Sequence, residues 1–213
     1  MSEKAKPGKV ILLNGSPHKE GSTYTALREV AAALKAEGID AEIIHVGLEA
    51  HRGCTACGYC KEHGKCVFND SVNEIAEKLE EADGIVIGSP VYYASPNGNL
   101  ISLLDRLFFS SSRAVKHMKI GASVVSARRG GCTASFDALN KYFTISGMPI
   151  VSSNYWNQIH GSNADDAKED LEGMQTMRML GKNMAFLIKA IRDGKEKYGL
   201  PELEKKVYTN FIR

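Results

Sequence analysis

The sequence predicts an α/β domain in which a parallel sheet carries helices on both faces. Short apolar runs, typical of buried strands, alternate with longer segments whose apolar residues recur every three or four positions. Of the 213 residues, 43% are hydrophobic and 24% are charged, as in ordinary globular proteins. Strands separated by helices pair in parallel through right-handed crossovers, so we expect one doubly wound sheet.

Each expected element follows from its local pattern. The first strand is the apolar run KVILL at 9–13, and the helix after it repeats apolar residues at Leu27, Val30 and Leu34. Further strands are expected at 41–46, 84–87, 120–125 and 149–152, and helices at 22–36, 72–82, 98–109, 133–146 and 167–191. Five such strands favour the flavodoxin-like order 2-1-3-4-5, which gathers ligand-binding loops at the carboxyl ends of the strands.

Composition narrows the class of protein further. A net charge of +2 is too small to indicate binding to nucleic acid or to a membrane surface. The polar start MSEKAKPGK does not resemble a signal peptide, and no apolar run is long enough to span a bilayer, so we expect a cytoplasmic protein. We expect one domain at 1–193 and a tail at 194–213 that packs on this domain or on a partner subunit.

The loop after the first strand has features of a phosphate site. Residues 14–23 read NGSPHKEGST, and a new helix begins where this loop ends. The free amides of Ser22, Thr23 and Tyr24 and the hydroxyls of Ser16, Ser22 and Thr23 are suited to bind an anion. Alternatively, Ser22 is only a helix cap and Ser16-Pro17 only a turn. The spacing matches neither the dinucleotide fingerprint nor a P-loop, which argues against a separate nicotinamide domain and against nucleotide hydrolysis.

The loop after the third strand is suited to hold a flat ligand. Residues 88–98 read GSPVYYASPNG, and two prolines and two glycines restrict this backbone. Tyr92 and Tyr93 are placed to cover a ring face, and backbone amides near Tyr92 and Asn97 to bond its polar edge. The candidate contacts in this loop are Pro90, Val91, Tyr92, Tyr93, Asn97 and Gly98. The alternative is an ordinary turn with surface tyrosines.

The loop after the fourth strand, SARRGG at 126–131, is expected at the same edge of the sheet. Its candidate contacts to the ring are Ser126, Arg128, Arg129 and Gly130. The alternative is a solvated arginine pair. Three candidate loops that converge on one crevice are a more specific indication of a binding site than any one of them. Together they favour a cofactor with a phosphate and a ring.

Four cysteines follow the second strand, as Cys54-x2-Cys57-x2-Cys60-x5-Cys66. Thiolates are soft ligands that suit iron–sulfur clusters or zinc. Five cysteines in all do not pair evenly, which argues against a disulfide framework. Zinc is the weaker reading, because four-cysteine zinc sites usually combine two separated C-x2-C knuckles. Free or redox-active thiols remain the other alternative.

Three segments resemble the NADPH-dependent FMN reductase-like branch of the flavodoxin-fold proteins: NGSPHKEGST at 14–23, GSPVYYASPNG at 88–98 and GMQTMR at 173–178. The resemblance implies a flavodoxin fold, bound FMN and a homo-oligomer, a homodimer or homotetramer, with the flavin near a subunit interface. The cysteine loop is similar to the compact motif of iron–sulfur flavoproteins in this branch. That similarity implies a [4Fe-4S] cluster held by Cys54, Cys57, Cys60 and Cys66.

We therefore expect an FMN-dependent oxidoreductase that takes electrons from NAD(P)H and passes them to a small acceptor such as a quinone. The flavin supplies the chemistry, so we predict no catalytic side chain. One alternative is a non-enzymatic carrier that relays electrons between redox proteins through FMN and the cluster. Another is a structural zinc clip on a degenerate flavodoxin fold.

Overall fold

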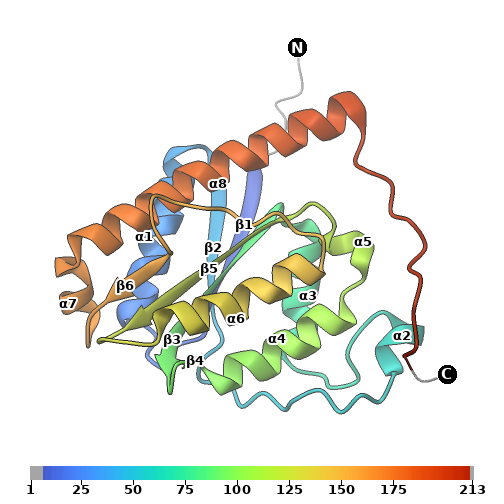
Figure 1. The fold of residues 1–213 in the computed structure, drawn as a ribbon, viewed down its shortest axis with the longest axis horizontal. Helices are drawn as coiled ribbons and strands as arrows, with labels where there is room; N and C mark the ends of the chain where they lie inside the picture. The colour runs from blue at the N-terminus through green and yellow to red at the C-terminus, as the bar shows by residue number, and fades with distance from the viewer. Residues whose placement is uncertain (1–6, 212–213) are drawn as a thin grey trace.

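The computed structural model describes residues 7–211 as one sheet covered by helices on both faces (Figure 1). The strands are β1 (Gly8–Asn14), β2 (Ile39–His45), β3 (Gly84–Tyr92), β4 (Ser95–Pro96), β5 (Ile120–Ala127) and β6 (Gln158–His160). The helices are α1 (Ser22–Ala36), α2 (Tyr59–His63), α3 (Ser71–Glu81), α4 (Gly98–Ser110), α5 (Arg113–Lys116), α6 (Cys132–Ile145), α7 (Ala164–Glu169) and α8 (Leu171–Tyr198). Within the described residues, parallel strands pair in the order β2-β1-β3-β5-β6, and β4 pairs antiparallel with β3. The expected doubly wound, flavodoxin-like sheet is confirmed.

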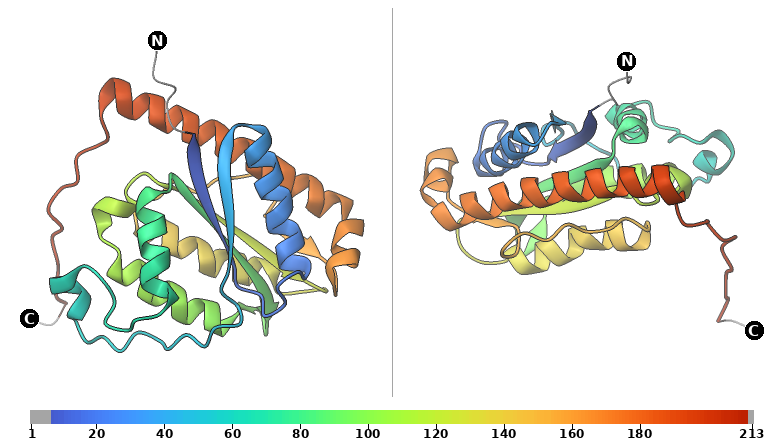
Figure 2. Two further views of the ribbon diagram at one scale, coloured as in Figure 1. Left: turned by 180° about the vertical axis from the view of Figure 1, so that it is seen from behind. Right: turned by 90° about the horizontal axis from the view of Figure 1, so that it is seen from above.

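The central strands are buried on both sides, which explains their continuous apolar sequences. Successive side chains of β1 alternate between the two faces of the sheet. Val10 and Leu12 pack with α1 and α8 on one face, whereas Ile11 and Leu13 pack with α3, α4 and α6 on the other. The two further views of the ribbon show the same layers from behind and from above (Figure 2).

Helices α1 and α8 lie very close together because α8 has a glycine at the contact. A Cβ atom on Gly181 would lie 2.6 Å from the Cβ of Ala33 and 2.8 Å from the carbonyl oxygen of Val30. The ion pair between Arg178 and Glu29, at 2.8 Å, joins the same two helices at the surface. This contact fixes the second half of α1 against α8.

The fifth strand differs from the expectation at 149–152. Only Ile150 pairs there, as a single bridge to Gly121, and the regular strand β6 lies further along at the end of β5. Between the Ile150 bridge and β6, the Nδ2 atom of Asn157 donates to the carbonyl oxygen of Ser123 at 3.1 Å, in place of a hydrogen bond from a backbone amide. The apolar run of two residues is too short to hold the chain at the sheet, so the intervening segment loops out.

The expected helix at 167–191 is two helices, α7 and α8. They meet at Asp170, whose carboxylate accepts hydrogen bonds from the amides of Gly173 (2.9 Å) and His160 (2.7 Å). A carboxylate that binds the free amides of a new helix start favours this break. No helix of residues 7–211 is both long and apolar enough to cross a membrane, α8 included.

After α8 the chain continues as an extended tail that leads away from the sheet (Figure 2). Side chains of the α5 region hold its first part: His117 Nε2 lies 3.0 Å from the carbonyl oxygen of Pro201, and Arg113 donates to that of Glu204 at 3.4 Å. The last two residues of the predicted tail, 212–213, and the polar start at 1–6 lie outside the described residues.

The glycine contact between α1 and α8 gives a stability test within one helix. We expect Gly181→Ala to lower the free energy of unfolding by about 1–3 kcal/mol, because the added methyl group overlaps backbone atoms of α1. Gly194→Ala is the matched control, since no atom lies within 4 Å of its Cβ position. It should raise stability by about 0.5–1 kcal/mol through helix propensity. Urea unfolding followed by circular dichroism measures both, and equal effects would contradict the packing described.

Candidate functional site

A cleft with a volume of about 640 Å³ lies at the carboxyl ends of β1, β3 and β5. Its walls are the loop after β1 with the start of α1, the last residues of β3, the end of β5 with the residue after it, and the segment that leads from β6 into α7. Parallel strands end at the same edge of a sheet, so their loops meet here, although they are far apart in sequence. The volume is within the range of about 300–1,000 Å³ typical of small-molecule sites.

The amino end of α1 forms one wall and is suited to bind an anion. Gly21 is the residue before the helix, and the first helical amide bond runs from Thr25 N to Gly21 O at 3.0 Å. The amides of Ser22, Thr23 and Tyr24 therefore have no partner within the helix. The first turn carries no acidic residue, so no negative side chain in it neutralises the positive end of the helix dipole.

The loop before α1 is held in shape by its own side chains. Asn14 accepts a bond from Ser16 N (3.1 Å) and donates to Lys19 O (3.0 Å). The hydroxyl of Ser16 accepts from His18 N at 3.1 Å, which leaves its own proton for a ligand. Gly47 packs directly against Ser16, and a Cβ there would lie 1.9 Å from the Ser16 carbonyl oxygen. The loop is thus preorganised rather than dependent on a ligand for its shape.

Two hydroxyl groups tie α1 to the neighbouring walls of the cleft. The Ser22 hydroxyl lies 2.9 Å from the carbonyl oxygen of Asn163 and 3.2 Å from that of Gly161, in the loop before α7. The hydroxyls of Thr23 and Ser126, at the end of β5, lie 2.7 Å apart. These contacts fix the distance between the α1 amides and the strand-end loops, so the cleft has a defined width.

The loop after β3 is a β-hairpin with a strained tip. Its two central residues, Tyr93 and Ala94, have positive φ angles of 52° and 59°, which favour glycine or asparagine. Tyr92 lines the cleft, whereas the Tyr93 side chain at the tip is fully exposed. Asn97 is buried and accepts bonds from the first amides of α4, so it caps that helix.

The structure brings about half of the predicted cofactor contacts to the cleft. The predicted residues that line it are Ser16, Ser22, Thr23, Pro90, Val91, Tyr92, Ser126 and Arg128. Those outside its lining are Pro17, Tyr24, Tyr93, Asn97, Gly98, Arg129 and Gly130. The roles of all of them as cofactor contacts stay predictions.

Sequence reasoning missed one complete wall of the cleft. The unpredicted lining residues are His18, Glu20, Gly21, Ala127, Gly161, Ser162, Asn163, Ala164 and Asp165. The last five are the loop between β6 and α7 (161–163) and the first two residues of α7, and Asn163 caps this helix through the amides of Asp165 and Asp166. The sequence SNADD is a typical helix start, and it would have indicated a new loop at the same edge of the sheet.

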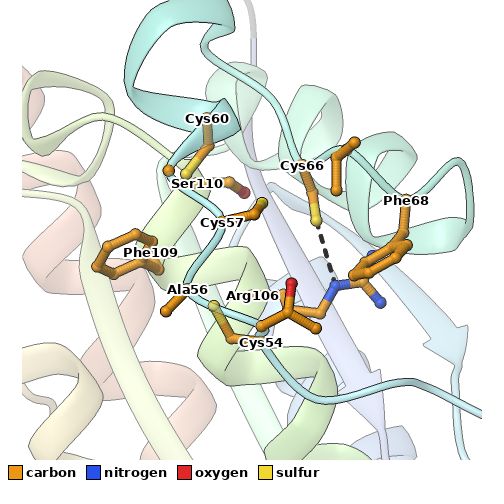
Figure 3. Close-up of a pocket in the computed structure, with 12 residues that line it drawn as sticks. Cys54, Ala56, Cys57, Cys60, Cys66, Phe68, Arg106, Phe109 and Ser110 are labelled. Carbon is orange, nitrogen blue, oxygen red and sulfur yellow. Dashed lines mark hydrogen bonds between the residues drawn. The ribbon is translucent and has the colours of Figure 1, made fainter.

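The four cysteines of the 54–66 loop line a second, smaller pocket (Figure 3). The short helix α2 lies between Gly58 and Gly64, whose φ angles of 78° and 69° allow sharp bends at its two ends. Val67, Phe68 and Phe109 add apolar surface to the same pocket. The loop thus directs four soft donor atoms to one partly apolar hollow.

Arg106 of α4 forms the inner wall of this pocket. Its guanidinium donates to both carboxylate oxygens of Asp70, at 2.7 and 2.8 Å, and its Nε donates to the sulfur of Cys66 at 3.3 Å (Figure 3). Burial of Asp70 opposes its ionisation, but the bonds from Arg106 outweigh that effect and lower the pKa of this carboxyl. The ion pair therefore stays charged beside the cysteines.

All five cysteines of the chain are free thiols, and burial raises the pKa of Cys60. Among residues 7–211, no group of three or more His, Cys, Asp or Glu side chains is arranged to hold a metal ion as it stands. The assignment of Cys54, Cys57, Cys60 and Cys66 as ligands thus stays a prediction. What the structure adds is that all four line the same pocket.

Comparisons with known proteins place the chain in a family. Residues 8–162 match the family described as NADPH-dependent FMN reductase, and the chain belongs to this family of flavin-dependent oxidoreductases. It is 36% identical over 196 residues to an iron–sulfur flavoprotein of Methanocaldococcus jannaschii, covering 86% of this chain and 99% of that protein. An iron–sulfur flavoprotein of Methanosarcina thermophila is 30% identical over 193 residues, covering 89% and 100%.

Solved structures are similar in fold. A flavodoxin from the domain Archaea superposes with a TM-score of 0.58 at 16% identity, covering 85% of this chain and 99% of that one. The resemblance inferred from the motifs at 14–23 and 88–98 is confirmed at the level of the family and the fold.

The anion site at α1 gives a test based on charge. We expect Ser22→Asp to weaken FMN binding about 10- to 100-fold relative to Ser22→Asn, since a carboxylate beside the amides repels the phosphate and a change of 1.4 kcal/mol is tenfold. The two variants have nearly the same size but differ in charge, and only the asparagine keeps a donor for the carbonyl oxygens of Gly161 and Asn163, so the thermal stability of both apoproteins is compared as well. Quenching of flavin fluorescence on titration of the apoprotein measures the affinity. Equal dissociation constants would contradict phosphate binding at α1.

Proposed function

We propose that this oxidoreductase holds FMN in the strand-end cleft and a [4Fe-4S] cluster in the cysteine pocket. In this proposal it takes electrons from NAD(P)H and passes them to a small acceptor such as a quinone. The observation that carries the proposal is the amino end of α1, whose free amides open into a cleft at the carboxyl ends of three strands. That arrangement fits a ligand with a phosphate at one end and a flat ring at the other.

The residues of the cleft fit FMN in chemistry as well as in size. The amides of 22–24 and the hydroxyls of Ser16 and Thr23 would hold the phosphate. Tyr92 and the backbone of the hairpin would lie against the ring, and the exposed Arg128 would supply positive charge near it. When bound, FMN supplies the redox chemistry, and the protein contributes position and electrostatics.

The cysteine pocket fits an iron–sulfur cluster. Four thiolates and the cluster together carry net negative charge, which a buried guanidinium beside them would stabilise. Arg106 is in that place, and the apolar side chains of Val67, Phe68 and Phe109 would limit contact with water. Both relatives named above are called iron–sulfur flavoproteins, which supports the same assignment.

A second candidate function is electron transfer between redox proteins, without turnover of a pyridine nucleotide. The exposure of Cys54 and Cys57 favours it, because a cluster held there would lie near the protein surface. A partner protein could then approach the cluster closely. Both functions use the same two cofactors and differ in the source and the acceptor of the electrons.

We also propose that the chain works as a homodimer or homotetramer, and that the tail packs on its own domain near Pro201 and Glu204 and on a partner subunit at its end. Large apolar side chains at the end of the tail are almost fully exposed: Val207 at 88%, Tyr208 at 81% and Phe211 at 96%. Apolar side chains gathered in this way favour a contact surface. Residues 1–193 would then form the FMN-binding domain.

Turnover of a reduced pyridine nucleotide distinguishes the proposed enzyme from the proposed electron carrier. We expect the protein loaded with FMN to oxidise NADPH or NADH with a quinone as acceptor, because the chain belongs to the NADPH-dependent FMN reductase family. Absorbance of the reduced nucleotide measures the rate, and the Ser22→Asp protein is the control. If the loaded protein shows no turnover but is reduced by a ferredoxin, the carrier is the correct reading.

The ligand set is tested by removal of one cysteine. We expect Cys57→Ala to lose the iron and sulfide of the anaerobically purified protein and to keep its FMN, because the pocket lies outside the flavin cleft. Cys132→Ala is the matched control, since Cys132 is buried at the start of α6 and lies outside the pocket. Unchanged iron in Cys57→Ala, or zinc in the unaltered protein, would show that the cluster assignment is wrong.

A further inference from the structure

Arg106 is an unusual residue for the interior of a protein, since its side chain is 2% exposed and remains charged. It lies on α4, and its polar partners come from two other segments of chain: the carbonyl of Arg52 before α2, and Cys66 and Asp70 in the loop between α2 and α3. The face of the guanidinium also covers the Phe68 ring, 4.9 Å from its centre. One side chain thus joins the cysteine loop to the body of the domain at several points.

The geometry leaves the guanidinium little freedom. A guanidinium has five N–H donors, and four bonds are formed here. Two go to Asp70 (2.7 and 2.8 Å), one to Arg52 O (3.3 Å) and one, from Nε, to Cys66 at 3.3 Å. The two-point pairing with Asp70 fixes the plane of the group, so the Nε–H bond is held on Cys66 and not on the other three cysteines.

We propose that Arg106 is a positioning residue for the iron–sulfur cluster, which donates a fixed N–H···S hydrogen bond to Cys66 and thereby raises the reduction potential of the cluster. The inference rests on the cluster assignment made in the proposed function, and it concerns which residue sets the potential. It gives the four ligands unequal roles, because Cys66 alone among them receives this bond from the guanidinium.

The direction of the effect follows from charge. When the cluster is reduced, one electron is added, no bond breaks, and the negative charge on the sulfurs grows. Hydrogen bonds and positive charge at the sulfurs favour that reduced state and so raise the potential. Asp70 opposes this effect, because its carboxylate partly cancels the charge of Arg106 from the other side of the guanidinium. The two residues should therefore shift the potential in opposite directions.

Two substitutions with opposite predicted signs test the proposal. Arg106→Lys keeps a positive charge but cannot bind both Asp70 and Cys66, since an ammonium lacks the two-sided geometry of a guanidinium. We expect its cluster potential to fall by about 59 mV or more, a tenfold change for one electron. Asp70→Asn keeps a helix-capping side chain for α3 and an amide oxygen that accepts from the guanidinium, but it removes the opposing charge, so the potential should rise. An anaerobic titration with dithionite as electron donor measures both potentials.

The controls separate this proposal from simpler ones. Arg52→Lys is the matched control, because Arg52 also lies over the Phe68 ring but is exposed, and its carbonyl is unchanged. Its cluster potential, and the FMN potential of every variant, should stay constant. Opposite shifts support the proposal, whereas unchanged potentials, or shifts of the same sign, overturn it. If the Arg106→Lys protein holds no cluster, the direction of the potential shift in Asp70→Asn decides: a rise supports the proposal, and a fall or no change overturns it. If the protein without substitutions contains no iron, the cluster assignment itself is wrong.

Discussion

The parallel register of β1, β3 and β5 is the constraint on which the strand-end cleft depends. Asn14 pairs with Gly88, and Gly88 pairs with Val124, so these three strands reach the same edge together. One further bond, from Gly15 N to Gly88 O at 2.9 Å, carries the pairing into the first loop. The α1 amides, the hairpin and the loop after β5 therefore face one another without needing direct contacts among all of them.

Helix α4 links this cleft to the cysteine pocket. Its first amides are capped by Asn97 at the base of the hairpin, and Arg106 lies nine residues further along. At 1.5 Å per residue the separation along the axis is about 14 Å. A shift of α4 would thus affect both the base of the hairpin and the wall of the cysteine pocket.

The sequence predicted the fold well wherever local pattern and tertiary structure agree. The run KVILL and the helix from Ser22 to Ala36 are examples, since burial and propensity favour the same conformation there. It did not predict the displaced edge strand, because the pairing of Gln158–His160 depends on Asn157 reaching a carbonyl of β5. Nor did it single out Arg106, whose burial is possible only because partners 36 to 54 residues away meet it.

The break in the edge strand also affects how the sheet ends. β6 has three residues, and Asn157 occupies a carbonyl that a continuous neighbour would otherwise bond. A long, regular edge presents a row of free amides and carbonyls on which another chain can add a strand, and this leads to aggregation. A short edge followed by an outward loop gives little surface for such an addition. The looped segment at 152–156 thus leaves little edge on which the sheet could grow.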